Sequence, residues 1–437
     1  METPYDVVII GGGPSGSAAA TILAKAGRKV VVLERERFPR FKIGESLLPF
    51  SIEAFERLGI RKKLDERFII KHGAEIVTSC GNHNIKFYFR EGLKNPHPTA
   101  YQVTRSEFDL LMLEHAQEAG AEVRQETAVK KVQFDGEGGD VHLENGEVLR
   151  AKYVLDASGR QSVLGTQFGS KVQYPNLRKF AVFAHFENVQ REPGEDGSLI
   201  RIIRTDDGWF WMIPLTETRM SIGKVIEQAD FKRAKLSPEA FLDKVIQEQP
   251  VVMERMKHAR RDSPVYAAGD YSYRNTRLTG DRWMLIGDAA GFIDPVFSTG
   301  VFMGLYSGLQ AADAIGIALK APRRAVHHFQ AYEKGLNKVM DLYLRFVSAW
   351  YQPEFIDIFV RPEERLQLPQ AVNAVLSGNL GRVWAVKWRM EIFYLLVKIQ
   401  KYIAIVPRLD LTPREPKEKR PLAPLPASAL ASGTAAD

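Results

Sequence analysis

The chain has 437 residues, 45% of them hydrophobic, and a formal net charge of +7. This length predicts two domains or one large one, and the hydrophobic fraction is ordinary for a globular protein. No apolar run is long enough for a spanning helix, the N-terminus does not resemble a secretory signal, and a single cysteine, Cys80, excludes an internal disulfide or a cysteine metal cluster. We expect a cytoplasmic protein without a transmembrane segment, without a bound metal and without a nucleic-acid partner, because no nucleic-acid motif accompanies the basic residues.

The N-terminus is predicted to form a strand, a turn, a helix and a second strand. Residues 5–10 are apolar and rich in β-branched side chains, and a glycine-rich turn follows at 11–16. Residues 17–25 are rich in alanine and favour a helix, which Gly27 can end. Residues 29–33 have the pattern of a buried strand, closed by Glu34. This order predicts a parallel β-α-β unit.

The remainder of the chain is predicted to be mixed α/β and then helical. Asp135-Gly136 and Asn145-Gly146 are turn signals between alternating strands. The predicted helices are 106–119, 300–320 and the region beyond 325, and the predicted strands include 153–155, 180–183, 200–204, 209–214, 220–225 and 283–286.

We therefore predict a Rossmann-like α/β domain with an inserted β-sheet domain and a helical C-terminal region. The predicted Rossmann-like parts are 1–75, 101–175 and 271–325, and the predicted parts of the inserted β-sheet domain are 76–100 and 176–270. Residues 326–415 form the predicted helical region, and 416–437 are predicted to be a disordered tail because proline, alanine and serine dominate them.

A dinucleotide site is predicted at the glycine turn. Gly11, Gly13 and Gly16 have the G-x-G-x-x-G spacing between a strand and a helix. Such glycines permit the tight turn, the approach of a pyrophosphate and close helix packing, and the helix N-terminus favours the phosphates. Glu34 stands where a carboxylate can accept hydrogen bonds from ribose hydroxyls.

Three later segments resemble the flavoprotein hydroxylase and halogenase superfamily, which implies that the dinucleotide is FAD. The resemblance also implies that the fold is a Rossmann-like FAD-binding domain with an inserted β-sheet substrate domain and a helical C-terminal region. The first begins at Arg105, the second is the turn from Asp156 to Arg160, and the third contains Gly287 and Asp288. In the resembling proteins the arginine of the first segment contacts the flavin, the second segment is a turn that contacts the nucleotide, and the aspartate of the third binds the ribityl or ribose hydroxyls of FAD. The cofactor contacts implied together are Gly11, Gly13, Pro14, Ser15, Gly16, Glu34, Arg35, Arg105, Asp156, Gly287, Asp288 and Gly300.

Two further segments resemble flavin-dependent halogenases of phenols and pyrroles. Residues 209–214 fit a W-x-W-x-I-P pattern, and Phe292, Pro295, Ser298 and Gly300 fit a second pattern. The resemblance implies that reduced FAD, oxygen and halide yield hypohalous acid, which reaches a lysine beside an aromatic substrate. Residues 38–40 and 44–49 also resemble this family.

The resemblance implies a role for several individual residues. Lys71 matches the lysine that activates the halogen, and its neighbour His72 is expected to be structural. Trp209 and Trp211 are implied to separate substrate from flavin, although two tryptophans at this spacing also fill a core on one strand face. Further implied contacts are Thr299 and Gly300 for the halide and Glu45 for the flavin side of the tunnel, and Ser46, Pro295 and Ser298 are additional candidate site residues in the matching segments.

No second glycine motif is present, so we expect a separate flavin reductase. The expected substrate is an electron-rich phenol or pyrrole, free or tethered to a carrier protein, with chloride or bromide as the halide. A monooxygenase or an isoprenoid-reductase-like enzyme on the same scaffold is the alternative, since residues 75–79 lack the aromatic run common in halogenases. A flavin-binding protein without enzymatic activity is a third possibility.

Overall fold

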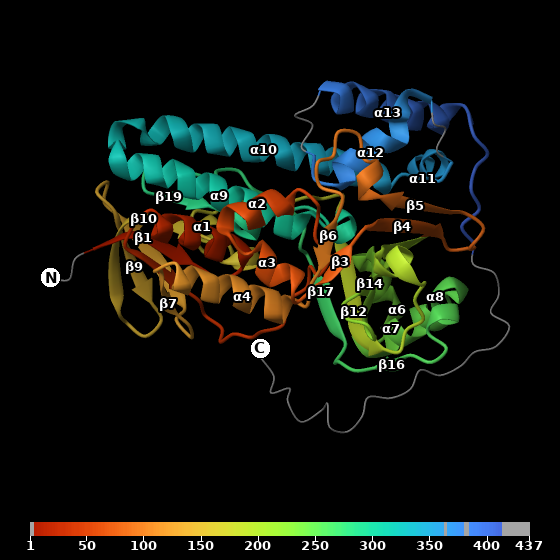
Figure 1. Ribbon diagram of the computed structural model, residues 1–437, viewed down its shortest axis with the longest axis horizontal. Helices are drawn as coiled ribbons and strands as arrows, with labels where there is room; N and C mark the ends of the chain where they lie inside the picture. Colours follow the sequence, from red (N-terminus) through yellow and green to blue (C-terminus); the bar gives the residue numbers. More distant parts are fainter. Residues whose placement is uncertain (1–3, 362–364, 380–383, 413–437) are drawn as a thin grey trace. The chain divides into compact units, whose positions relative to one another are not determined.

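The computed structural model describes residues 4–361, 365–379 and 384–412 (Figure 1). Two compact units divide the chain, and each is built from segments that are far apart in the sequence. The first unit contains residues 1–66, 103–175 and 271–345. The second contains residues 67–102, 176–270 and 346–437. The tail predicted at 416–437 lies outside the described residues.

The first unit is organised around a sheet whose central strands are parallel. Valine and isoleucine dominate β1 and β2, and their side chains are buried, as expected where both faces of a parallel sheet are covered. β10 pairs with β1 on one side, and with β19 and β9 on the other. The parallel strands, in spatial order, are β7 (Glu122–Arg124), β2 (Val30–Leu33), β1 (Tyr5–Ile10), β10 (Val148–Asp156) and β19 (Trp283–Leu285).

The predicted turns at Gly136 and Gly146 are confirmed. They connect β8 (Val129–Phe134), β9 (Gly139–Leu143) and β10 as antiparallel neighbours, and both glycines have positive φ. Asp135 and Asn145 accept hydrogen bonds from backbone amides of their own turns. A small separate sheet consists of β11 (Lys171–Gln173), β18 (Tyr273–Asn275) and β20 (Gly291–Phe292).

Helices α1 (Pro14–Lys25), α4 (Arg105–Glu118) and α9 (Thr299–Lys320) pack together beside this sheet (Figure 1). A Cβ on Gly308 of α9 would lie 2.5 Å from the carbonyl oxygen of Ser15, so glycine allows the two backbones to approach. α9 is long and apolar enough to cross a membrane, but 72% of its most apolar window is buried inside the protein. That burial is typical of a core helix. The other helices of this unit are α2 (Ser51–Leu58), α3 (Arg61–Asp65), α5 (Val163–Gln167) and most of α10 (Ala325–Trp350).

The second unit is organised around a mainly antiparallel sheet. β4 and β13 are its parallel pair, and the other neighbours are antiparallel. A separate pair consists of β3 (Ile69–Lys71) and β6 (Ala100–Gln102). The strand order is β16 (Arg260–Arg261), β12 (Lys179–Glu187), β15 (Arg219–Glu227), β14 (Gly208–Pro214), β13 (Ile200–Thr205), β4 (Gly73–Thr78) and β5 (Asn84–Tyr88), and β17 (Tyr266–Gly269) also pairs with β12.

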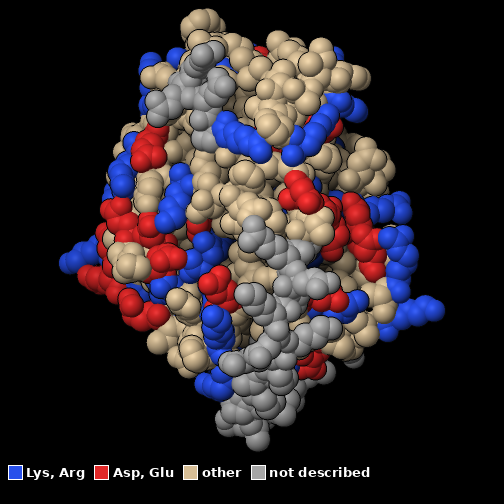
Figure 2. Space-filling model, turned by 90° about the vertical axis from the view of Figure 1, so that its right-hand side faces the viewer, with Lys and Arg blue, Asp and Glu red and all other residues tan. Residues whose placement is uncertain are grey.

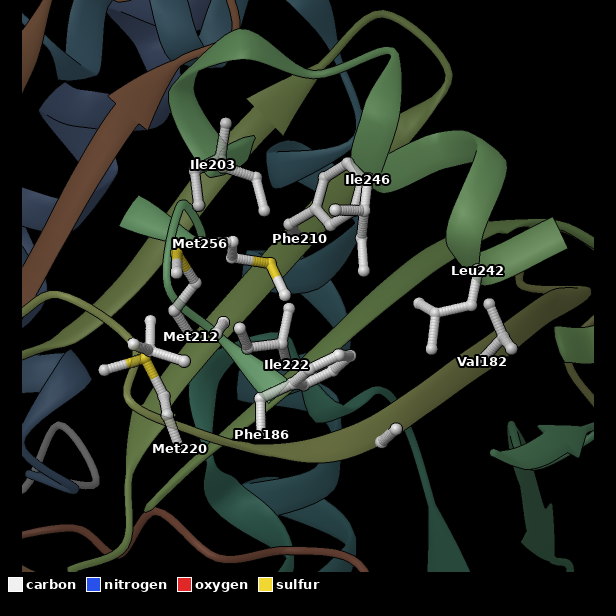
Figure 3. Close-up of a cluster of buried hydrophobic side chains, with 14 of the residues drawn as sticks. Val182, Phe186, Ile203, Phe210, Met212, Met220, Ile222, Leu242, Ile246 and Met256 are labelled. Carbon is white, nitrogen blue, oxygen red and sulfur yellow. The ribbon is translucent and has the colours of Figure 1, made fainter. Parts of the chain in front are cut away.

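One face of this sheet carries a buried hydrophobic cluster (Figure 3). Phe210 and Met212 of β14 point into it, together with Leu242 and Ile246 of a covering helix. Side chains alternate along a strand, so Trp209 and Trp211 lie on the opposite face. The covering helices are α6 (Gln228–Ala234), α7 (Pro238–Gln247) and α8 (Pro250–Arg255).

The fold class expected from the sequence is confirmed, and it includes a helical C-terminal region. That region contains α11 (Pro353–Phe359), α12 (Leu368–Leu376) and α13 (Trp384–Tyr402) after the end of α10. Figure 2 shows one face of the molecule, on which basic and acidic side chains are interspersed. The net charge of +7 therefore does not gather into a single basic patch on that face.

Candidate active site

Four sequence segments meet at the carboxyl ends of the parallel strands of the first unit. The glycine turn follows β1, Glu34 follows β2, Asp156 ends β10, and Gly287 comes shortly after β19. β1 lies between β2 and β10, and β10 pairs with β19. In open α/β sheets this edge is where ligands bind.

The three motif glycines have different structural roles. Gly11 has φ of +103°, and a Cβ there would lie 2.4 Å from the carbonyl oxygen of Ala157. A Cβ on Gly16 would lie 2.0 Å from the carbonyl oxygen of Gly11. Gly13 has an ordinary extended conformation, and its Cβ would have only the Arg40 guanidinium nearby, at 3.6 Å. The turn itself needs Gly11 and Gly16, whereas a Cβ on Gly13 would meet no backbone atom within 4 Å.

Glu34 is buried and held in one orientation beside the glycine turn. Its Oε2 accepts a hydrogen bond from the amide of Gly12 at 2.7 Å, and its Oε1 accepts one from the amide of Glu36 at 2.9 Å. Each carboxylate oxygen can accept a further bond, so the residue remains suited to ribose hydroxyls. The neighbouring Arg35 is exposed and donates to Gln161 at 3.1 Å.

Arg105 and Asp288 supply charge on the same unit. The Arg105 guanidinium is buried and forms a bidentate pair with Asp109, at 2.8 and 2.9 Å. Its Nη1 donates to the carbonyl oxygen of Ile43 at 2.5 Å. Burial raises the pKa of Asp288, and the positive charges of Arg105 and Arg160 oppose that shift. A half-buried carboxylate among cations is suited to accept hydrogen bonds from ligand hydroxyls.

Two of the predicted cofactor residues direct their side chains at the protein itself. The Asp156 carboxylate is fully buried and accepts bonds from the amide and hydroxyl of Ser158 and from the amide of Leu164. It shapes the following turn. The Ser15 hydroxyl lies next to Gly287, whose Cβ would be 2.4 Å from it. The Ser15 side chain packs between α1 and α9, beside Gly287 and Gly304. Its backbone amide at the start of α1 is therefore the group that can bind a phosphate.

The start of α9 contains the predicted halide residues. Ser298 is the N-cap, has φ of +57°, and forms no capping hydrogen bond with its side chain. Thr299 is buried, and Gly300 packs against the Phe292 ring, which would lie 3.1 Å from a Cβ at that position. The preceding short helix, Pro295–Phe297, is capped by Asp294, which accepts from the amide of Val296 at 2.9 Å. The backbone amides in the first turn of α9 are therefore not occupied by their own cap residue.

Lys71 lies in the second unit, at the end of β3. Its side chain is 2% exposed, and Nζ is 5.1 Å from the centre of the Phe89 ring. Burial lowers the pKa of Lys71 to about 7, so the ammonium and amine forms coexist near neutral pH. The ring of His72 contacts the hydroxyl of Ser198 at 2.9 Å, in agreement with the structural role expected for that residue.

Trp209 and Trp211 are buried side by side in the second unit, with ring centres 5.8 Å apart. The Trp211 indole donates to Ser221 at 3.1 Å and covers Gly223, where a Cβ would lie 2.3 Å from the ring. The Trp209 indole donates to the hydroxyl of Tyr351 at 3.0 Å. Sequence reasoning missed Tyr351, since its only signal was an aromatic residue just after a long helix.

Glu75 begins the segment that departs from the usual halogenase pattern, and it forms a buried ion pair. Arg201 on the parallel neighbour β13 donates to both carboxylate oxygens, at 2.7 and 2.9 Å. Burial acts to raise the pKa of Glu75, but the bonds from Arg201 outweigh it and hold the pKa below its usual value. The pair joins β4 to the rest of the sheet.

Replacement of Glu75 by Gln is expected to lower the free energy of unfolding by about 3 kcal/mol, because the Arg201 charge loses its buried partner. A depressed carboxyl pKa contributes stability that is complete above the unfolded value of 4.5 and is lost as the pH falls through the folded value. The difference between wild type and variant should therefore shrink in acid. Urea unfolding at pH 7 and pH 3 measures it, and an equal difference at both values would contradict the assignment.

Comparison with known proteins agrees with this geometry. The family profile described as "FAD binding domain" matches residues 4–334. A 1H-pyrrole-2-carbonyl-[peptidyl-carrier protein] chlorinase of Pseudomonas fluorescens is 32% identical, over 86% of this chain and 90% of its own. The chain belongs to the flavin-dependent halogenase family.

Other halogenases support the same membership. A tryptophan 2-halogenase of Chondromyces crocatus is 32% identical over 72% of this chain and 62% of its own. The flavin-dependent brominase Bmp2 has a TM-score of 0.81 at 28% identity, covering 91% of this chain and 99% of its own. This halogenase is therefore a flavoprotein oxidoreductase that binds FAD, and the cradle at the end of the parallel strands is suited to that cofactor.

Proposed function

We propose that this halogenase uses halide and oxygen to halogenate an electron-rich aromatic compound, a phenol or a pyrrole. The observation that carries the proposal is Lys71, a lysine that is 2% exposed and whose pKa burial lowers to about 7. Burial to this extent is uncommon for a lysine, and the lowered pKa is what a reactive amine needs. Lys224 is equally buried but forms an ion pair with Asp207. Bound FAD, when reduced by a separate reductase, supplies the activation of oxygen.

The residues of the chain divide the remaining tasks. We assign the halide to the backbone amides of Thr299 and Gly300, because amides at a helix start favour an anion. Lys71 receives hypohalous acid and presents the halogen to the aromatic ring. Trp209 and Trp211 keep the substrate from the flavin. We assign Glu45 to the flavin side and keep Ser46, Pro295 and Ser298 as further candidate residues of the site.

The substrate can be tethered to a carrier protein. The similar chlorinase of Pseudomonas fluorescens acts, according to its name, on a pyrrole bound to a peptidyl carrier. The match covers 90% of that relative, so the comparison extends over nearly the whole length of the chlorinase. We place the enzyme in the cytoplasm, where reduced flavin and carrier-bound intermediates are available.

A product screen tests the proposed function. The protein is incubated with FAD, a flavin reductase, NADH, oxygen and bromide, and with a panel of phenols, indoles and pyrroles presented free and as carrier thioesters. Mass spectrometry should reveal a bromine isotope doublet in at least one product that is absent without bromide. An oxygenated product that forms equally well without halide would instead support a monooxygenase. NADPH oxidation by the protein alone would support a reductase.

A further inference from the structure

Two arginines of the first unit share one buried carboxylate. Asp109, on α4, has no exposed surface. Its Oδ1 accepts from Arg105 Nε at 2.8 Å, and its Oδ2 accepts from Arg105 Nη2 at 2.9 Å and Arg40 Nη1 at 2.8 Å. The Arg40 side chain is 10% exposed and that of Arg105 is 8% exposed. Both cations are therefore largely removed from water and fixed by the same group.

The two arginines face different parts of the cofactor cradle. Arg40 Nη2 lies 3.6 Å from the position that a Cβ on Gly13 would take, so this nitrogen faces the space beside the glycine turn. Arg105 Nη1 lies 2.8 Å from the corresponding position on Gly44 and feels the charge of Asp288. One carboxylate thus connects the region suited to a pyrophosphate with the region suited to the flavin side.

The charges of this cluster are not balanced by Asp109 alone. The two guanidinium groups share the Asp109 carboxylate, and Arg105 also feels the charges of Asp288 and Glu45. The additional partner of Arg40, Glu36 at 2.9 Å, is 38% exposed and therefore screened by water. Arg40 uses Nε for Glu36 and Nη1 for Asp109, which leaves Nη2 directed at the turn. A bound diphosphate would give Arg40 Nη2 an anionic partner, since guanidinium groups bind phosphate oxygens well.

We propose that Asp109 is a positioning residue for FAD binding, which holds Arg40 against the pyrophosphate and Arg105 at the flavin side. Asp109 is the group that both arginines share, and its charge offsets the repulsion between two neighbouring cations in a poorly hydrated site. The proposal rests on FAD binding and is independent of whether the enzyme halogenates. The role of Asp109 in FAD binding can therefore be rejected while the proposed halogenation stands. Equally, the proposed halogenation can be rejected while the role of Asp109 stands.

The test compares Asp109→Asn, Arg40→Gln and the double variant by flavin fluorescence titration with FAD and by calorimetry with ADP. Each single variant should raise the FAD dissociation constant about tenfold or more, the loss expected for one charge-assisted contact. Arg40→Gln should weaken ADP similarly, because the diphosphate is the shared group. The FAD dissociation constant of the double variant should exceed that of the weaker-binding single variant by no more than about twofold. Both substitutions remove the same contact between Asp109 and Arg40, so their effects should not add.

Asp313→Asn is the matched control, because Asp313 pairs with Arg57 on the exposed surface of the same unit. It should leave FAD and ADP binding unchanged. A merely structural Asp109 would lower the melting temperature of the apoprotein while FAD binds within twofold of wild type, which would overturn the proposal. Additive losses in the double variant would overturn it as well. If Asp109→Asn does not fold, unchanged ADP binding by Arg40→Gln is sufficient to reject it.

Discussion

Replacement of Lys71 by Met is expected to reduce halogenation at least about 100-fold, the size typical of losing a group that acts directly on the reacting atoms. FAD affinity should not change, because the cofactor cradle belongs to the first unit and Lys71 to the second. Methionine retains the length of the side chain and suits a site with 2% exposure. Product formation by mass spectrometry and flavin fluorescence titration measure the two effects separately.

Lys62→Met is the control for loss of a lysine, since the Lys62 side chain is 91% exposed. It should retain full activity. The free energy of unfolding of Lys71→Met can also be compared with that of wild type. Burial of an ammonium group is unfavourable, and methionine removes that cost. We therefore expect Lys71→Met to be at least as stable as wild type at neutral pH. A variant that halogenates normally would show that the activating group lies elsewhere.

The pH dependence of Lys71 follows from its pKa, which burial lowers from 10.5 to about 7. Between these values the unfolded chain binds a proton that the folded protein does not, so the free energy of unfolding gains a contribution that rises with pH. Lys71→Met should remove that rise, and denaturant unfolding at pH 7 and 9 measures it. If the neutral amine receives the halogen, wild-type activity should increase as the pH passes about 7, whereas a decrease would indicate that the ammonium acts as a hydrogen-bond donor.

Substitution of the motif glycines is expected to have the second large effect. It distinguishes a glycine that the fold of the turn requires from a glycine that only cofactor binding requires. Gly16→Ala places a Cβ 2.0 Å from the carbonyl oxygen of Gly11, which is backbone and cannot move aside. We expect the apoprotein to lose about 3 kcal/mol of stability, the upper range for overpacking, and to be isolated without FAD. Thermal unfolding and the flavin absorbance of the purified protein measure both losses.

Gly13→Ala is the matched variant for this experiment. Gly13 has an extended backbone, and the nearest atom to its Cβ is the end of a flexible arginine side chain at 3.6 Å. The apoprotein should unfold within a few degrees of wild type, but FAD affinity should fall at least about tenfold, equivalent to about 1.4 kcal/mol, because the methyl group occupies the space for the pyrophosphate. Equal FAD affinity in Gly13→Ala and wild type would show that the cofactor does not approach the turn there.

Local patterns were sufficient to predict much of the fold. The apolar run at Tyr5–Ile10, the glycine turn and the alanine-rich helix are each determined by neighbouring residues, and the structure confirms all three. The turns at Gly136 and Gly146 were equally predictable, because asparagine or aspartate before glycine favours a tight turn whatever surrounds it. The segment around Arg105 was also identifiable, since its helix and its arginine occur together in the sequence.

Contacts between distant segments were not predictable in the same way. Tyr351 meets Trp209 across 142 positions, and Glu75 meets Arg201 across 126. Both contacts depend on strand pairing and side-chain packing between distant segments, which a short stretch of sequence does not reveal. The turn at Asp156 was identified by its motif, but the sequence did not show that its carboxylate binds the amides of Ser158 and Leu164. A motif identifies a carboxylate but not the direction in which its oxygens point.

The sequence by itself determined that this protein has a strand-turn-helix cradle for a dinucleotide, because the glycine spacing and the hydrophobic periodicity are local properties. Only the tertiary structure decided which charges act together at that cradle. Arg40 and Arg105 are 65 positions apart in the chain, and they share Asp109 because α4 brings its buried face against the loop that contains Arg40. Burial, which also lowers the pKa of Lys71, is a property of the packed molecule and cannot be determined from any single residue.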